Sequence, residues 1–442
     1  MASKLFNFRH LSVRFFSDVN PLLAQPTQSY EITTLPNKLL VASFDNNSPT
    51  SRISIAYRVG ARDEPLENLG VSHAVRASAG LSTKQISAFM IVRNLQQMGA
   101  NFYTTSDRES FSFKLEGKRD NIEHAMPFLS EVACNNSFKP WEVSEIIPRM
   151  KIDLESRNNA IKTVENLHKV AFHYGLGNSI YCPKYFLKEL DSETLMHYYY
   201  NNFVPSRGLV IGQGIEHETL VSFAQSLEIC QNVVKPHNDR TPSKYYGGEI
   251  RFDKSGKEAT FAIAVQGASM KNRKESLAFG ILSKIFGTGP HVQWGTESKS
   301  ILSRNIESDL CTNVFTFNVS YSDNGLFGII GTCAADKAAK VVEGSFKTLR
   351  TGKISDDDFQ RGKNQLISDL YMEAESVKSQ LDYSINQLLH FGSYQTVQDL
   401  VGEIEGVSIS DVNNIAKKIT TSKISMSSYG RIHNVPFLSD LK

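Results

Sequence analysis

Two short segments decide the fold: Ser106-Asp-Arg-Glu-Ser-Phe111 and Ser322-Asp-Asn-Gly-Leu-Phe327, which share serine, aspartate and phenylalanine at the same spacing. The second begins 216 residues after the first (106 to 322). Upstream of each is a strand-like segment, and downstream are a second strand-like segment and a helical pattern of apolar residues. That helical pattern covers 122–129 in one copy and 338–346 in the other. The two segments therefore belong to an internal repeat.

The repeat continues downstream at a nearly constant separation. His173-Tyr-Gly175 matches His390-Phe-Gly392 at 217 residues, and Gly214 matches Gly430 at 216. Because a constant separation over so long a stretch is hard to obtain by chance, the chain is interpreted as two copies of one domain. In both copies, pairs of strands lie between long helices. This pattern predicts the α+β class, with a mainly antiparallel sheet packed with helices in each domain.

A polar segment separates the two copies. Residues 236–244 include two prolines and show no apolar periodicity, so we expect a linker there. The predicted organisation is therefore two tandem homologous domains, at 28–235 and 245–442. A chain of 442 residues is long enough for two or three domains.

Composition excludes several classes of function. The 48 lysine and arginine residues nearly balance the 46 aspartate and glutamate residues, and this argues against nucleic-acid binding through bulk positive charge. No apolar run approaches the roughly 20 residues that a membrane-spanning helix needs. The cysteines are scattered and never form a Cys-x-x-Cys pair, so we expect reduced, mostly buried thiols. They are Cys134, Cys182, Cys230, Cys311 and Cys333.

The amino terminus differs from the rest of the chain. Lys4, Arg9 and Arg14 are interspersed with apolar residues and serines, and no acidic residue precedes Asp18. This composition is typical of a mitochondrial transit peptide, which we expect to span 1–16. A frayed terminus with a few chance positive charges is the alternative interpretation. A mature chain in the reducing matrix would agree with the unpaired cysteines.

A helix after residue 68 carries the motif with the most chemical content. A predicted strand at 53–59 runs into Gly60-Ala-Arg-Asp-Glu64, and Leu69-Gly-Val-Ser-His73 then opens the helix. On a duplicated α+β chain, this arrangement resembles the pitrilysin-type metallopeptidases, the family that includes the mitochondrial processing peptidase. In active members the helix carries His-x-x-Glu-His, whose histidines bind zinc and whose glutamate activates the zinc-bound water. A carboxylate on a later helix is the third ligand.

This chain departs from that pattern within the helix. His73 is kept, but Arg76 stands at the glutamate position and Ala77 at the second histidine position. A later helix offers the acidic residues Glu145, Asp153 and Glu155. Asp153 is nearest to the spacing that the resemblance implies. Two protein ligands are too few for a catalytic zinc ion, and the Arg76 charge would repel it. We therefore expect a degenerate zinc site in the first domain and no catalytic, cofactor-binding or metal-binding residue in the chain.

Four other segments have chemically interesting compositions and simpler interpretations. Gly287–Gly295 is rich in glycine but lacks the Gly-Lys-[Ser/Thr] ending of a phosphate loop, so we expect a surface loop. Tyr198–Tyr200 is expected in a helix, partly in the core. Glu216–Glu218 is expected to form a solvated turn, and Ser355–Asp358 the start of a helix.

Longer segments indicate which members of the family the chain resembles. They are Trp141–Val143, Glu165–His168, Asn178–Pro183, Lys244–Arg251, Gly287–Val292 and Ser320–Gly328. From about residue 28 onward, the chain resembles the non-catalytic family members that are core subunits of mitochondrial ubiquinol–cytochrome c reductase. This resemblance implies a structural subunit without cofactors, peripheral to the inner membrane on its matrix side.

The resemblance also implies partners and leaves two alternatives open. The expected partners are core protein 1, cytochrome b, cytochrome c1 and the Rieske iron–sulfur protein, with no nucleic acid. One alternative is a substrate-recognition subunit of a processing peptidase. Pro290 and Trp294 in the short glycine-rich segment weaken it, because those subunits carry a longer flexible loop. The other alternative is an active zinc peptidase with a rearranged site.

Overall fold

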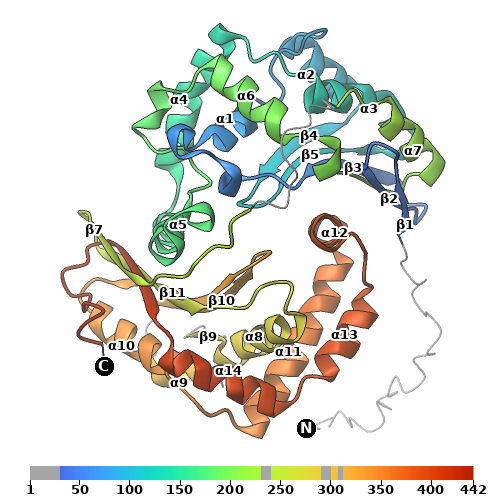
Figure 1. Ribbon diagram of the computed structural model, residues 1–442. Helices are drawn as coiled ribbons and strands as arrows, with labels where there is room; N and C mark the ends of the chain where they lie inside the picture. Colours follow the sequence, from blue (N-terminus) through green and yellow to red (C-terminus); the bar gives the residue numbers. More distant parts are fainter. Residues whose placement is uncertain (1–29, 230–239, 290–299, 307–311, 442) are drawn as a thin grey trace, which may run out of the picture.

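The computed structural model describes residues 30–229, 240–289, 300–306 and 312–441, which form two halves, each built on one sheet (Figure 1). The predicted α+β class and the tandem repeat are confirmed, because five of the six described strands in each sheet follow the same order, and each sheet has one further strand, at opposite edges. The segment 1–16, residues 236–239 of the predicted linker and most of the glycine-rich segment lie outside the described residues, as do Cys230 and Cys311. Cys134, Cys182 and Cys333 are buried and free, as expected.

The first half holds six strands and seven α-helices among the described residues. The strands are β1 (Glu31–Thr34), β2 (Leu40–Phe44), β3 (Thr50–Tyr57), β4 (Asn101–Ser106), β5 (Phe111–Lys118) and β6 (Gly208–Gln213). The helices are α1 (Val71–Ser78), α2 (Ala88–Gln97), α3 (Arg119–Cys134), α4 (Pro140–Ser156), α5 (Asn159–Phe172), α6 (Ser192–Asn202) and α7 (His217–Ser226). The strand order is β1-β2-β6-β3-β5-β4, and β2 with β6 is the one parallel pair.

The second half repeats this arrangement. Its strands are β7 (Gly248–Asp253), β8 (Glu258–Gln266), β9 (Thr288–Gly289), β10 (Asn313–Ser320), β11 (Gly325–Ala334) and β12 (Ile424–Gly430). Its helices are α8 (Arg273–Phe286), α9 (Ile301–Asn305), α10 (Ala338–Leu349), α11 (Asp356–Glu375), α12 (Val377–Phe391), α13 (Val397–Glu405) and α14 (Ile409–Thr421). In the order β7-β12-β8-β11-β10-β9, β7 with β12 is again the one parallel pair.

Each sheet has a different set of helices on each of its faces. One face carries helices of its own half, and buried apolar residues such as Ile53, Phe113 and Leu129 form the core there. The equivalent core of the second half includes Phe279 and Phe327. The alternation of apolar residues along these strands supplies both cores.

The other face of each sheet is covered by a helix from the opposite half. Helix α5 lies against β7, β8, β11 and β12, and helix α12 lies against β3 and β6. Leu167 and Phe172 of α5 pack on Ala262 and Leu326, and α12 packs in the same way on the first sheet. Figure 1 shows both helices between the two sheets. The halves are therefore joined by an exchange of helices, which single-domain sequence patterns do not reveal.

One expected turn is the start of a helix. Glu216-His217-Glu218 was expected to be a solvated turn, but α7 begins at His217. The His217 ring is within hydrogen-bond distance of Thr33 Oγ1 (2.8 Å) and Ser43 Oγ (2.7 Å). The expectation was wrong because these partners, on β1 and β2, are distant in sequence and local patterns cannot show them.

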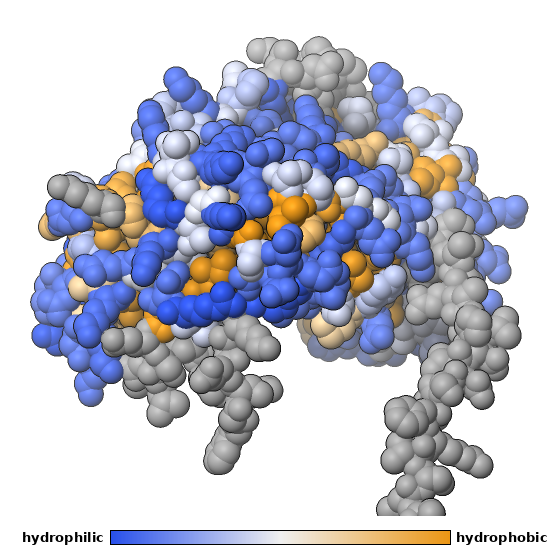
Figure 2. All heavy atoms as spheres, turned by 90° about the horizontal axis from the view of Figure 1, so that it is seen from below, coloured by the Kyte–Doolittle hydropathy of each residue, from blue (hydrophilic) through white to orange (hydrophobic). Residues whose placement is uncertain are grey.

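Within the described ranges, no helix is both long and apolar enough to cross a bilayer. Figure 2 shows a face on which hydrophilic residues predominate and apolar residues reach the surface in separate areas.

Candidate functional site

Helix α1, which carries His73, begins at a tightly constrained turn. Its N-cap residue, Gly70, has a φ of 89°, in the left-handed region that favours glycine, and a side chain there would overlap Cys182. The buried carboxylate of Glu64 accepts hydrogen bonds from the amides of Gly70 (2.7 Å) and Ser72 (2.9 Å). Because these amides have no partner within the helix, Glu64 acts as its cap and fixes the position of His73.

The His73 ring is completely buried and neutral. Burial, assisted by the charge of Arg76, lowers the pKa of His73 to about 4. Its Nδ1 accepts a hydrogen bond from the Cys182 amide (3.3 Å), so the ring proton is on Nε2. Nε2 lies 3.6 Å from Oδ2 of Asp153, which is longer than a hydrogen bond. Asp153, singled out from the sequence, is thus the carboxylate of α4 that lies beside His73.

Two guanidinium groups lie over the Tyr181 ring, which contacts the His73 ring. The Arg157 guanidinium lies 4.5 Å from the centre of the Tyr181 ring, and that of Arg76 lies 5.6 Å from it. The same ring meets the His73 ring edge-on at 5.5 Å. Arginine over an aromatic face is a favourable arrangement. The charges of Arg76 and Arg157 oppose protonation of the imidazole, in the same direction as burial, and outweigh the opposite effect of Asp153 on the His73 pKa.

These residues do not fit a catalytic zinc ion. His73 and Asp153 could supply two ligands, whereas a catalytic zinc site uses three protein ligands. Arg76 and Ala77, one turn along from His73, supply none. Glu145 and Glu155 are exposed, and Glu155 faces Lys184 at 3.6 Å. In the described part of the chain, no three His, Cys, Asp or Glu side chains are grouped so as to hold a metal ion.

A second cluster of polar residues joins the two halves, and the repeated motifs meet in it. Arg62 binds Oε1 of Glu109 through Nη1 (2.5 Å) and binds Asp323 through both η nitrogens (2.8 and 2.6 Å). The Glu109 carboxylate also accepts the amide (2.8 Å) and hydroxyl (2.6 Å) of Ser322. Burial acts to raise the pKa of Glu109, but the bonds from Ser322 and the nearby charges hold it below its usual value. We name the set Arg62, Glu109, Ser322 and Asp323 the interdomain junction.

The described end of the predicted linker contacts this interdomain junction. Arg240 binds Asp63 with two hydrogen bonds (2.8 and 2.5 Å), and its Nη1 lies 3.7 Å from Glu109. The Ser243 amide donates to Asp323 (2.7 Å). Residues 240–244 are therefore held by charged side chains from both halves.

A buried ion pair connects helix α5 to the loop that follows β4. Arg108 binds Glu165 (2.7 Å), and its Nε donates to the Leu176 carbonyl (3.1 Å). Although burial opposes it, the Arg108 charge keeps the pKa of Glu165 below its usual value. His168 receives a hydrogen bond from the Tyr321 hydroxyl (2.8 Å), and burial lowers its pKa to about 3. The Arg108 contacts hold α5 within the first half, and the His168–Tyr321 bond connects α5 to the turn between β10 and β11 of the second half.

Two other segments singled out from the sequence contribute to the core and to a helix cap. Tyr198 and Tyr199 are buried on α6, and the Tyr198 hydroxyl donates to the Gly60 carbonyl (3.0 Å). Ser355 caps α11 by accepting a hydrogen bond from the Asp358 amide (3.2 Å). The start of that helix was predicted correctly, because a serine followed by acidic residues is a local signal.

Sequence patterns missed the residues that complete both clusters. Tyr181 lies in the segment Asn178–Pro183, which carries the family resemblance, but nothing in the sequence marks Arg157. Arg62 belongs to the quoted motif, but its partner Asp323 comes from the other copy of the repeat. The sequence holds one signal for this contact, which is that Asp323 lies within the repeated Ser-Asp motif.

Comparison with known sequences gives two family matches along the chain. Residues 40–184 match the family described as Insulinase (Peptidase family M16), and residues 189–366 match the one described as Peptidase M16 inactive domain. The boundary between the two matches lies before β6, although β6 pairs with β2 and β3 in the first sheet.

Individual relatives are similar over nearly the whole chain. Cytochrome b-c1 complex subunit 2, mitochondrial, of Mus musculus is 34% identical over 421 residues, which cover 94% of this chain and 92% of the relative. The protein of the same name from Homo sapiens is 33% identical with the same coverage. Probable mitochondrial-processing peptidase subunit alpha-1 of Arabidopsis thaliana is 26% identical over 92% of this chain and 82% of the relative.

Proposed function

Because this chain belongs to peptidase family M16 and is a relative of cytochrome b-c1 complex subunit 2, we propose that it is a non-catalytic structural subunit of the mitochondrial cytochrome b-c1 complex. In that complex it is equivalent to core protein 2. One observation carries the proposal: 34% identity across 94% of the chain to a subunit of that complex. The processing-peptidase relative is less similar, at 26%.

The geometry around His73 supports the absence of peptidase activity. His73 and Asp153 supply too few ligands for zinc, and the guanidinium of Arg76 stands where active relatives are expected to hold a general base. A guanidinium does not accept a proton near neutral pH. The interdomain junction and the exchanged helices hold the two halves in one fixed arrangement, as a structural subunit requires.

The position in the complex forms part of the proposal. We expect the chain to be peripheral on the matrix side of the inner membrane, paired with core protein 1 and in contact with cytochrome b, cytochrome c1 and the Rieske protein. Relatives named as subunits of a mitochondrial complex, and described helices too short or too polar to span a membrane, support this.

Native gel electrophoresis of detergent-solubilised mitochondria tests this function. A tagged copy of the full chain is expressed in mitochondria, and the gel is stained for haem and probed for the tag. We expect the tag and the haem of the cytochrome subunits to migrate in one band. Migration as a haem-free soluble heterodimer would instead indicate a processing-peptidase subunit and would contradict the proposal.

A further inference from the structure

A cavity of about 540 Å³ opens between the two halves, next to the surroundings of His73. It is lined by the end of α4, one side of α5 and the segment 177–185 from the first half. The second half contributes Phe252, Lys254 and Tyr429. Its volume lies in the range of cavities that hold small organic ligands.

The charged residues of the cavity are mostly basic. Its lining includes five basic residues, Arg157, Lys162, Lys169, Lys184 and Lys254, and two acidic ones, Glu155 and Glu165. The charge of Glu165 is already balanced by Arg108, at 2.7 Å. Glu155 is exposed, and its carboxylate lies 3.6 Å from Lys184. An uncompensated excess of positive charge therefore lines the cavity, and such a site attracts anions.

The Arg157 guanidinium is fixed in a position from which it can bind an anion. Its Nε donates to the Leu154 carbonyl (3.1 Å), and its guanidinium lies 4.5 Å from the centre of the Tyr181 ring. No described carboxylate forms an ion pair with it, so its two η nitrogens remain available to a ligand. Burial lowers the pKa of Arg157 relative to free arginine, as expected of a guanidinium without an adjacent counter-ion. A guanidinium fixed in this way can bind two oxygen atoms of one group.

The remaining lining suits an organic part of the ligand. Tyr181, Tyr185, Phe252 and Tyr429 contribute aromatic surface, and the Lys162 ammonium lies 5.6 Å from the centre of the Tyr429 ring. An inorganic ion would leave most of this surface and volume unused. Several cations around one fixed guanidinium favour a phosphate group, which carries more charge and more acceptor oxygens than a carboxylate.

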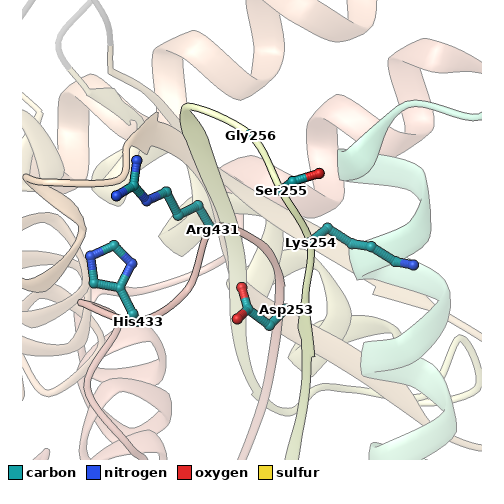
Figure 3. Close-up of a pocket in the computed structure, with 6 residues that line it drawn as sticks. All are labelled: Asp253, Lys254, Ser255, Gly256, Arg431 and His433. Atoms are coloured by element: carbon teal, nitrogen blue, oxygen red, sulfur yellow. The ribbon is translucent and has the colours of Figure 1, made fainter.

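A neighbouring hollow helps to define which residues belong to the site. That hollow, about 410 Å³, is lined by Asp253, Lys254, Ser255, Gly256, Arg431 and His433. Figure 3 shows the Lys254 side chain extending away from Arg431 and His433, toward helix α5. All six residues are exposed, so this hollow offers no buried group to hold a ligand. Lys254 therefore belongs with the larger cavity.

We propose that this cavity binds an organic phosphate, with Arg157 and Lys162 contacting the phosphate and the aromatic residues contacting the organic part. The source is either the headgroup of an anionic phospholipid or a free phosphorylated metabolite, because both present the same chemistry.

Binding measurements on the full chain test the proposal. The probes are inorganic phosphate, glycerol 3-phosphate, and phosphatidylcholine vesicles with or without phosphatidylglycerol. The variants are Arg157→Gln, Arg157→Lys and Arg157→Gln with Lys162→Gln. Arg93→Gln is the charge-matched control, because Arg93 is an exposed residue of α2 outside the cavity. Thermal unfolding of each variant establishes that it is folded.

We expect saturable binding of an organic phosphate, tighter than that of inorganic phosphate. Arg157→Gln should weaken it at least about tenfold, Arg157→Lys less, the double variant more, and Arg93→Gln not at all. Binding only to phosphatidylglycerol vesicles identifies a lipid headgroup, and binding of glycerol 3-phosphate identifies a soluble ligand. Equal affinities in Arg157→Gln and Arg93→Gln, or no saturable binding to any probe, would overturn the proposal and leave the structural function untouched.

Discussion

At the scale of single residues, the segment Gly60-Ala-Arg-Asp-Glu64 combines three structural tasks. The Gly60 backbone lies so close to the carbonyls of Asp107 and Arg108 that a side chain would overlap them. Arg62 reaches into the second half, and Glu64 caps the helix of His73. None of these tasks requires a metal. The segment can therefore keep its resemblance to that of a peptidase for structural reasons alone.

His73 gives the chain a predictable dependence on pH. Its folded pKa is about 4 and its ordinary value is 6.5, so the unfolded chain takes up a proton first as the pH falls. The resulting stability is present above pH 6.5 and is lost toward pH 4. Between pH 7 and pH 5 the free energy of unfolding should fall by about 2 kcal/mol through this residue alone.

Urea unfolding at pH 7 and pH 5 measures this effect. His73→Gln should lose about 2 kcal/mol less than the wild type between the two pH values. His197→Gln, which changes an exposed histidine on α6, should behave like the wild type. Equal losses in wild type and His73→Gln would show that the His73 pKa is not depressed.

At the scale of elements, the exchanged helices are the least predictable part of the fold. The sequence predicted the strands around the Ser-Asp segments and the helices after them, because alternation and helical periodicity are local. It also placed Asp153 near His73 through the family spacing. It could not show that α5 packs on the second sheet, because an apolar helix face does not specify which sheet will cover it.

Leu167 tests the exchange of helices. It is fully buried between α5 and the second sheet, so Leu167→Ala should lower the free energy of unfolding by about 2–5 kcal/mol. Ile161→Ala, on the same helix but 37% exposed, is the matched control and should cost much less. Urea unfolding of both variants gives the comparison. Equal costs would mean that α5 does not pack against the second sheet as described.

At the scale of the whole molecule, the interdomain junction fixes one half relative to the other. Arg62 pairs with one carboxylate from each half, and both lie in the repeated motif. The repeat that reveals the two domains in the sequence is thus also the place where they meet. Buried charge of this kind is costly to leave unpaired, so the junction opposes any separation of the halves.

Arg62→Ala should destabilise the chain strongly. It removes the guanidinium that pairs with both Glu109 and Asp323, and the expected cost is about 3–5 kcal/mol in the free energy of unfolding. Arg119→Ala is the control, because its pair with Asp45 lies at the surface and should be worth about 1 kcal/mol or less. Thermal or urea unfolding measures both. A cost for Arg62→Ala no greater than that for Arg119→Ala would show that the junction does not hold the halves together.

We propose that the chain keeps a metallopeptidase fold without the metal chemistry, and the zinc content of the purified chain is the decisive measurement. The wild-type chain and the variant Arg76→Glu with Ala77→His are purified in the presence of zinc, dialysed, and analysed for metal and for cleavage of a presequence peptide. The variant provides the comparison because it restores the family motif. We predict no tightly held zinc and no cleavage in the wild type. One tightly bound zinc ion per wild-type chain, with cleavage that a chelator abolishes, would show that the chain is an active metallopeptidase.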